Sequence, residues 1–221
     1  MRGYRGFILS LGLLFSPAAL AQHYPSSTGE DLKTCDTHLQ YKGKFINPHV
    51  VEVLEGWISD RTQPTINSVD VAAAWGTDQF FDADVTYAQD GAKYVTEDKP
   101  GNPSQSYSYK WIGRLSNGLH AIETTSWGGG GSMISTHLLL LRCSKGQGWR
   151  LHFETDSQGN DLPESRAQEY ESYTRLNLTI DRSYSIGDRV VAAYALKGNT
   201  VTVTFPNLPK AHPLVIRADA K

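Results

Sequence analysis

The chain has 221 residues and is weakly acidic, with 21 lysines and arginines against 23 aspartates and glutamates, a net charge of −2 at pH 7. Charges of both signs are scattered along it without a basic stripe, which argues against a nucleic-acid partner and against a polybasic membrane patch. This length favours one domain with an ordinary hydrophobic core.

The N-terminal residues 1–21 have the three-part pattern of a cleaved secretory signal. Arg2 and Arg5 precede an apolar run over 7–15, and Ala19-Leu20-Ala21 supplies small residues before Gln22. The run is too short to span about 30 Å of hydrocarbon, which needs roughly 20 apolar residues. We therefore predict export, cleavage after Ala21, and a mature chain of residues 22–221 with no integral membrane segment.

The chain contains two cysteines, Cys35 and Cys143, and both lie beyond the predicted signal. In an oxidising compartment such a pair is most simply one disulfide, although two free buried thiols are the alternative. The two are not in a C-x-x-C arrangement, which disfavours a redox-active pair. We predict a Cys35–Cys143 disulfide in a periplasmic or secreted protein.

Residues 22–56 begin with a polar stretch and continue into a predicted helix. Proline, serines and glycine cluster within 22–34, which is typical of a mobile leader. Asn47 can cap a helix and Pro48 suits its first position. Apolar residues then recur at helical spacing at positions 50, 51, 54, 57 and 58, although the valines among them would also suit a strand.

Short strands predominate from residue 65 onward. They are predicted over 65–75, 80–87, 93–96, 106–115, 119–127, 133–143, 149–155, 175–181, 189–196 and 200–205. Asn117-Gly118 between apolar runs predicts a hairpin, and the four runs within 106–155 predict an antiparallel meander. The prolines and glycine of Lys99–Pro103 interrupt the predicted strands. This segment is either a joint between two domains or a long surface loop, and the loop is the favoured interpretation.

The C-terminal third combines a second predicted helix with further strands. The helix begins near Asp161, with an apolar stripe of Ala167, Tyr170 and Tyr173. Prolines at 206, 209 and 213 predict an irregular tail, and Asn177-Leu178-Thr179 is a formal glycosylation sequon. The whole predicts a single mainly β domain over 22–221, an antiparallel meander closed as a barrel or sandwich, with one or two short helices.

The glycine run after Trp127 is one candidate binding element. A phosphate-binding loop would need a lysine and a hydroxyl at fixed spacing, and a hydrolase elbow would need G-x-S-x-G; neither is present here. A glycine-tipped loop that approaches a partner is the remaining functional interpretation, beside a plain flexible hairpin tip. The predicted binding residues are Trp127, Gly128, Gly129, Gly130 and Gly131.

Histidines in the meander are the second candidate. If Gly128-Gly129 were a two-residue turn, His120 would lie directly opposite His137, and with His152 and nearby glutamates they could hold zinc or copper. The glycines leave the register ambiguous, and His137 shares its strand face with leucines. A hydrogen-bonded, partly buried histidine is therefore favoured. We predict no metal and no cofactor, and keep His120 and His137 as binding candidates.

Three function classes fit these features. The leading hypothesis is an exported, non-catalytic protein that binds another envelope or secreted protein, as inhibitors, immunity proteins and assembly factors do. A hydrolase of envelope or extracellular polymers is the second; its paired acids would be Asp82 with Asp84, or Glu123 with Glu154. The third is a carbohydrate-binding module that uses exposed tryptophans.

Overall fold

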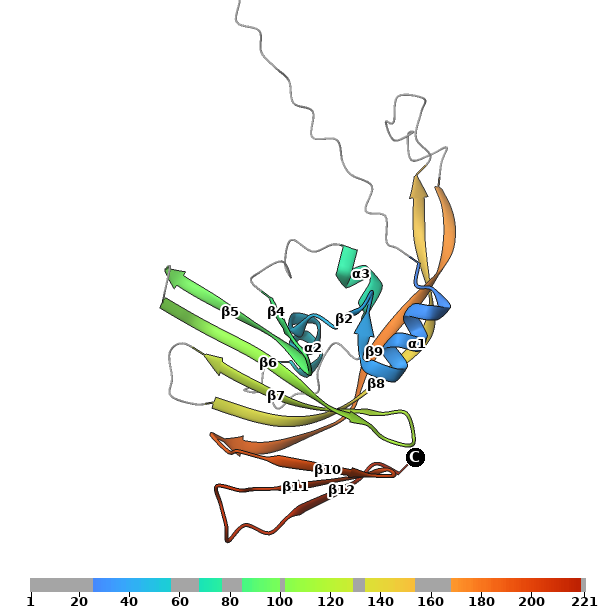
Figure 1. Cartoon of the computed structure of the whole chain (residues 1–221). Helices are drawn as coiled ribbons and strands as arrows, with labels where there is room; N and C mark the ends of the chain where they lie inside the picture. Colours follow the sequence, from blue (N-terminus) through green and yellow to red (C-terminus); the bar gives the residue numbers. More distant parts are fainter. Residues whose placement is uncertain are drawn as a thin grey trace, which may run out of the picture.

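The computed structural model describes residues 26–56, 68–76, 85–99, 102–128, 134–153 and 168–219. Within these residues the protein is mainly β with three short helices (Figure 1). None of these helices is long and apolar enough to cross a membrane.

Seven strands form one antiparallel sheet in the order β3-β9-β8-β7-β6-β5-β4. From β4 to β9 each strand pairs with the next one in the chain, so the predicted antiparallel meander is present, although its third and fourth predicted strands are the single strand β8. The strands are β3 (Val69–Asp70), β4 (Thr86–Ala88), β5 (Gly91–Lys99), β6 (Asn102–Arg114), β7 (His120–Gly128), β8 (Ile134–Phe153) and β9 (Gln168–Asp188).

The main sheet curls into an open half-barrel and does not close on itself (Figure 1). The sequence predicts a meander closed as a barrel or sandwich; the mainly β, sandwich- or barrel-like architecture is present, but the main sheet is not closed. Helices pack into the concave side of the sheet. In a small closed barrel the side chains of the strands fill this interior, so no room would remain for the helices. Lys99 pairs with Asn102 at the end of the β5–β6 pair, and residues 100 and 101 of the predicted interruption lie outside the described residues.

Helix α1 (Gly29–His38) lies where the sequence predicts a mobile leader. A capping box begins it: Asp31 N–H donates to the Thr28 hydroxyl at 3.1 Å, and Thr28 N–H donates to the Asp31 carboxylate at 2.8 Å. Residues 29–34 are thus helical and not an irregular leader. The helix is polar and buries only Cys35, which explains why its apolar periodicity is weak in the sequence.

Helix α2 (Pro48–Glu55) begins as predicted, because Asn47 accepts a hydrogen bond from His49 N–H and Pro48 occupies the first turn. The helix ends at Gly56, and positions 57 and 58 lie outside the described residues. Helix α3 (Val71–Gly76) replaces the C-terminal part of the strand predicted over 65–75, since alanine favours the helix and Asp70 caps it through Ala72 N–H.

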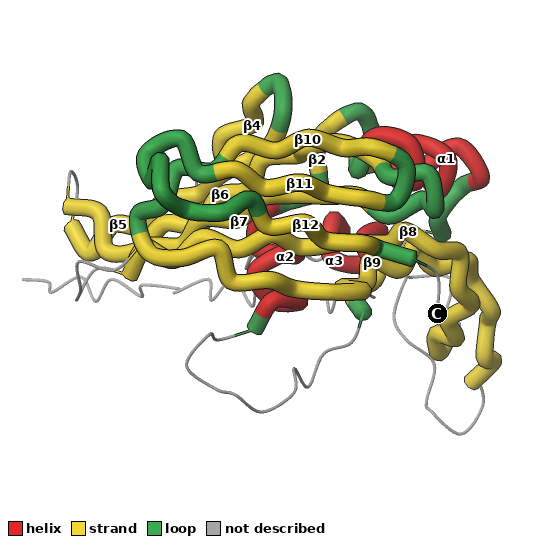
Figure 2. Tube along the Cα trace, turned by 90° about the horizontal axis from the view of Figure 1, so that it is seen from below, coloured by secondary structure: helices red, strands yellow, loops and turns green. Residues whose placement is uncertain are grey.

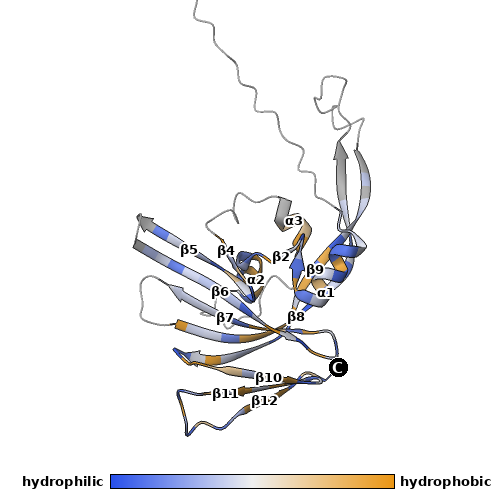
Figure 3. Cartoon of the chain, in the orientation of Figure 1, coloured by the Kyte–Doolittle hydropathy of each residue, from blue (hydrophilic) through white to orange (hydrophobic). Residues whose placement is uncertain are grey.

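Both faces of the main sheet are covered, by different layers. Helices α2 and α3 and the small β1–β2 hairpin (Gln40–Tyr41, Lys44–Phe45) cover the concave face, and hydrophobic residues gather there (Figure 3). Leu139 and Leu141 point to that core, whereas Leu138 and Leu140 point to a second core on the convex face. This accounts for the unbroken leucine run of β8, which alternating burial on one face would not produce.

A second sheet covers the convex face (Figure 2). It contains β10 (Ala193–Lys197), β11 (Thr200–Thr204) and β12 (Leu214–Arg217) in that order, and packs Val201, Val203 and Ile216 against the main sheet. The predicted irregular tail therefore contains a strand, because β12 pairs with β11 from Leu214 to Arg217.

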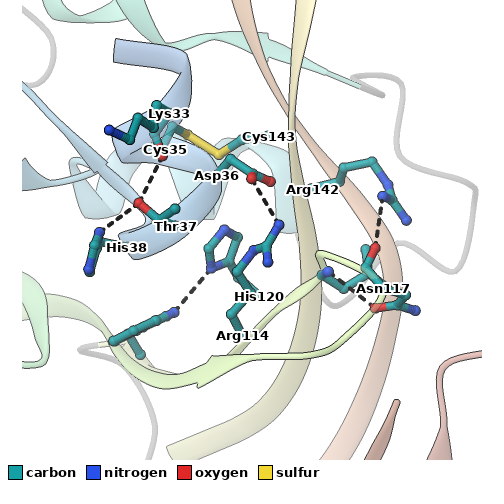
Figure 4. Close-up of polar contacts among 12 residues, drawn as sticks. Lys33, Cys35, Asp36, Thr37, His38, Arg114, Asn117, His120, Arg142 and Cys143 are labelled. Carbon is teal, nitrogen blue, oxygen red and sulfur yellow. Dashed lines mark hydrogen bonds and ion pairs between the residues drawn. A yellow bond between two sulfur atoms is a disulfide. The ribbon is translucent and has the colours of Figure 1, made fainter. Parts of the chain in front are cut away.

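The Cys35–Cys143 disulfide is present, as predicted. It ties α1 to β8 across 108 residues, with the two Cα atoms 5.9 Å apart (Figure 4). A disulfide of this kind suggests an oxidising, extracytoplasmic compartment.

Strands β8 and β9 continue far beyond the sheet as a two-stranded ribbon, residues 144–153 paired with 168–177 (Figure 1). β7 covers β8 only as far as Leu141. The break predicted between the strands over 133–143 and 149–155 is absent, since the single strand β8 runs through it. The predicted helical stripe of Tyr170 and Tyr173 is also wrong, since both lie in β9. Asp161, where that helix was predicted to begin, lies outside the described residues.

Candidate functional site

The residues predicted to form a binding site lie in three separate places. His137, on β8, faces the concave core under α2. His120, the first residue of β7, lies on the same face of the sheet, next to α1. Trp127 pairs with Ile134 on the convex side and is partly buried. Gly128 is exposed at the end of β7, and residues 129–131 lie outside the described ranges. These residues do not form one site.

The conditional pairing of His120 with His137 is wrong. His120 pairs with Leu141, and His137 pairs with Thr124. The connection between β7 and β8 is longer than the two-residue turn that the pairing required, so the register shifts by four residues. An even shift keeps both histidines on the concave face but separates them along it. The described residues contain no group of three or more metal-ligating side chains.

Glu55, at the C-terminal end of α2, joins that helix to the sheet below it. One of its carboxylate oxygens accepts from the Tyr107 hydroxyl at 2.6 Å. The other accepts from the Thr124 hydroxyl at 3.2 Å and lies 2.5 Å from His137 Nδ1. The Glu55 and His137 side chains are only 6% and 11% exposed. Burial raises the pKa of Tyr107 well above its usual value, so this hydroxyl stays protonated and donates a hydrogen bond to Glu55.

Glu52, one turn earlier in α2, makes a second and more open set of contacts. It accepts from the Tyr94 hydroxyl at 2.5 Å and from the Gln105 side-chain amide at 3.0 Å. The His49 ring stacks on Tyr94 with their centroids 3.7 Å apart. The Glu52 side chain is 29% exposed, so water can reach its hydrogen bonds, whereas those of Glu55 are buried.

These two carboxylates hold α2 in the concave side of the sheet, and that is their evident structural role. We expect Glu55→Ala to lower the free energy of unfolding by about 2 kcal/mol, because it leaves three buried donors without their acceptor. Glu52→Ala is expected to cost about 1 kcal/mol, since water can replace its contacts. Urea unfolding of the two variants measures both values. An equal loss, or a larger one for Glu52→Ala, would contradict this order.

His120 is fully buried between β7 and the end of α1 (Figure 4). Its Nδ1 accepts from the Trp111 indole N–H at 3.2 Å. An indole nitrogen only donates, so the neutral ring carries its own proton on Nε2, which faces the backbone at Cys35 and Asp36. Burial, followed by the charge of Arg114, lowers the pKa of His120 to about 4. Its surroundings therefore favour a neutral, structural histidine.

The β8–β9 ribbon presents the largest exposed aromatic side chains among the described residues. Trp149 is 65% exposed and Tyr170 is 73% exposed. Trp149 lies opposite Ser172, and Leu151 lies opposite Tyr170. Directly opposed residues share a face of an antiparallel pair, so Trp149 and Tyr170 are diagonal neighbours on one face.

A cleft of about 440 Å³ lies next along the ribbon, and one of its lining residues, Ser172, pairs with Trp149. It is formed where the segment before α1 meets the ribbon, and its lining is polar. The lining residues are Ser26, Lys145, Gly146, Gln147, Ser172, Tyr173 and Thr174. A polar cleft next to two exposed rings can offer hydrogen bonds and apolar contact to the same ligand.

Sequence reasoning missed this face for a definite reason. Tyr170 and Tyr173 are three residues apart and suggest a helix, although Tyr170, Ser172, Thr174 and Leu176 also alternate as a half-exposed strand does. That alternation was the available signal. No signal marked Glu52 and Glu55, which look like the solvent face of a helix in the sequence.

No family model, curated protein or solved structure matches the chain.

Proposed function

We propose that this chain is an exported, non-catalytic binding protein, which holds another envelope or secreted protein on the ribbon face that carries Trp149 and Tyr170. The exposure of these two rings is the observation that carries the proposal. In a double-membrane bacterium the location would be the periplasm, and otherwise the protein would be secreted.

The export part rests on the pattern of residues 1–21 and on the disulfide. The two are independent, since one is a sequence feature of the N-terminus and the other joins residues 108 positions apart. Both fit a protein that works in an oxidising compartment. Intact mass of the protein exported by its own signal tests this part: we expect a chain that begins at Gln22 and contains one disulfide.

The binding part rests on the cost of exposing aromatic rings to water. Tryptophan and tyrosine are the residues that most often anchor protein interfaces, because they bury a large area with little loss of side-chain freedom. Here two of them lie on one face of a projecting ribbon, beside a polar cleft that can supply hydrogen bonds. This is the composition of an interface with an aromatic centre and a polar rim.

A hydrolase is the second candidate, and one observation favours it. Glu55 holds His137 by Nδ1, which is how a carboxylate orients a histidine that acts as a general base. Both side chains are nearly sealed under α2, however, and an acting base must reach its substrate. The acid pairs predicted earlier do not supply a better site, since Glu123 lies on the convex face beside Tyr194 and the other three acids lie outside the described residues.

Paired variants test the binding proposal in the native host. Tagged wild-type protein and the variant Trp149→Ser with Tyr170→Ser are isolated after export, and co-purifying proteins and glycans are quantified. We expect one specific protein to be depleted at least tenfold with the variant. The control is Val191→Ser with Val215→Ser, which removes two exposed apolar side chains away from the ribbon. Equal depletion by the control would contradict the proposal, and so would depletion of a glycan alone.

A further inference from the structure

Among the described residues, the outer edge of β9 has partners along part of its length and none along the rest. In a strand the N–H and C=O of one residue point the same way, and the residue two positions on repeats that direction. Leu178 of β9 pairs with Val69 of β3, and Leu176 N–H donates to the Asp70 carboxylate at 3.4 Å. The even-numbered residues of β9 therefore point away from β8 in this region.

The segment before α1 continues this edge by one step. Ser27 N–H donates to the Thr174 carbonyl at 2.9 Å, and Thr174 N–H donates to the Ser26 hydroxyl at 3.0 Å. An extended segment thus already adds to β9 here in the manner of an extra strand.

The next outward-pointing residues are Ser172 and Tyr170, and no backbone partner for their outer side lies among the described residues. The register between β8 and β9 is regular through this region, so the outward direction persists. The cleft lies at this same point, since it is lined by Ser26 on one side and by Ser172 and Thr174 on the other. The occupied edge ends where the cleft begins.

We propose that an extended segment of the partner protein adds as a strand to β9 at Ser172 and Tyr170, and fills the cleft past Ser26. Strand addition uses unpaired backbone groups for affinity and alternate side chains for specificity. This step rests on the proposed binding function and gives it a mechanism. An unpaired strand edge is a liability in an exported protein unless something covers it, which gives a physical reason for a partner there.

The chemistry of the cleft face defines the segment that fits. By register, this face carries Lys145, Gln147 and Trp149 from β8 and Tyr170, Ser172 and Thr174 from β9. It contains one cation and no acid. The segment should therefore place apolar side chains over the two rings and one acidic side chain near Lys145.

Proline substitution at the open edge tests the pairing directly. Ser172→Pro removes an outward N–H while leaving the β8 side intact, and proline is tolerated on strand edges of this kind. Ser172→Ala is the matched control, since it loses the hydroxyl and keeps the N–H. Tyr170→Pro is the second variant, in case the first perturbs the ribbon. Circular dichroism and the disulfide mass establish that each variant folds.

The probe is a phage-displayed library of random linear peptides, selected on the mature chain. We expect selected peptides to carry an acidic residue among alternating apolar ones, and to lose about tenfold or more in affinity for Ser172→Pro but not for Ser172→Ala. Lys145→Gln should weaken them severalfold. Peptides that bind both Ser172 variants equally would overturn strand addition while leaving the aromatic face as the binding surface.

Hydrogen exchange tests whether the chain's own N-terminal segment, and not a partner, already pairs with this edge of β9. In the isolated mature chain the Thr174 amide should be protected and the Ser172 and Tyr170 amides should exchange freely. Protection of both in the absence of any partner would overturn the proposal, because the edge would then be closed from within. If the variant without the two rings no longer co-purifies the partner but Ser172→Pro still binds it as the wild type does, the proposed binding function stands and the strand-addition mechanism is wrong.

Discussion

Replacing both cysteines, as Cys35→Ala with Cys143→Ala, is expected to lower the free energy of unfolding by about 4–5 kcal/mol. The disulfide closes a loop of 108 residues, and a cross-link of that span removes much of the chain entropy of the unfolded state. For a mature chain of this length the melting temperature should fall by roughly 10–15 °C. The effect is this large because α1 is polar and buries little besides Cys35, so few other contacts hold it to β8.

Urea unfolding of the oxidised wild type and of the double variant measures this difference. The single variant Cys35→Ala is a useful comparison, since it breaks the same bond and leaves one thiol in place. Its stability should match that of the double variant within about 1 kcal/mol, because loss of the cross-link accounts for most of the change. A double variant within about 1 kcal/mol of the wild type would show that α1 is held by its packing alone.

His120 is expected to make the protein acid-sensitive. Its pKa is about 4 in the folded protein, against 6.5 for an unperturbed histidine, chiefly because burial disfavours the charged ring. As the pH falls below about 6.5, His120 becomes protonated in the unfolded chain but stays neutral in the folded protein. The contribution of His120 is therefore fully present above that pH and is lost as the pH falls to about 4, a loss of about 3 kcal/mol.

The variant His120→Asn isolates this contribution, because asparagine does not titrate and its side-chain oxygen can still accept from Trp111. Unfolding free energies are compared from about pH 7.5 to pH 4. The advantage of the wild type over His120→Asn should shrink by about 3 kcal/mol across this range. His212→Asn, at an exposed position of the C-terminal segment, is the matched substitution control. Parallel curves for His120→Asn and wild type would contradict the buried, neutral histidine.

The features that the sequence predicts correctly depend on contacts between near neighbours. Asn117-Gly118 forms the turn between β6 and β7, where Gly118 has a φ of +84° and the Asn117 side chain accepts from Leu119 N–H. Asn47 and Pro48 begin α2 for equally local reasons. The disulfide is also predictable from the sequence, because a chain with two cysteines allows only one pairing and export favours oxidation.

The features that the sequence does not predict depend on distant partners. Gly146 and Gly148 suggest a turn, yet they lie inside β8 because side chains of β9 cross them. A Cβ at Gly146 would lie 2.3 Å from the Asn177 amide nitrogen, and one at Gly148 would lie 2.6 Å from the Tyr173 ring. These glycines are needed for close approach and not for a turn. Asn177, the first residue of the formal sequon, is therefore packed over Gly146.

The candidate sites follow the same division. His137 is correctly predicted to be a partly buried, hydrogen-bonded histidine, because its place among the leucines of β8 is a local pattern. Its partner Glu55 is 82 residues away, and no local pattern connects the two. The exposed face of Trp149 and Tyr170 depends on the pairing of β8 with β9, which the predicted helix near Asp161 would have prevented.

Photo-cross-linking in the native host tests the binding face most directly. A photo-reactive phenylalanine analogue replaces Trp149 or Tyr170 in turn, and Val191 or Val215 in the matched controls, which are also exposed. On illumination of intact cells or culture, positions 149 and 170 should both cross-link to the same envelope or secreted protein, and the controls should not. Cross-links that are absent at the two ribbon positions, or equally strong at all four, would contradict a binding function for this face.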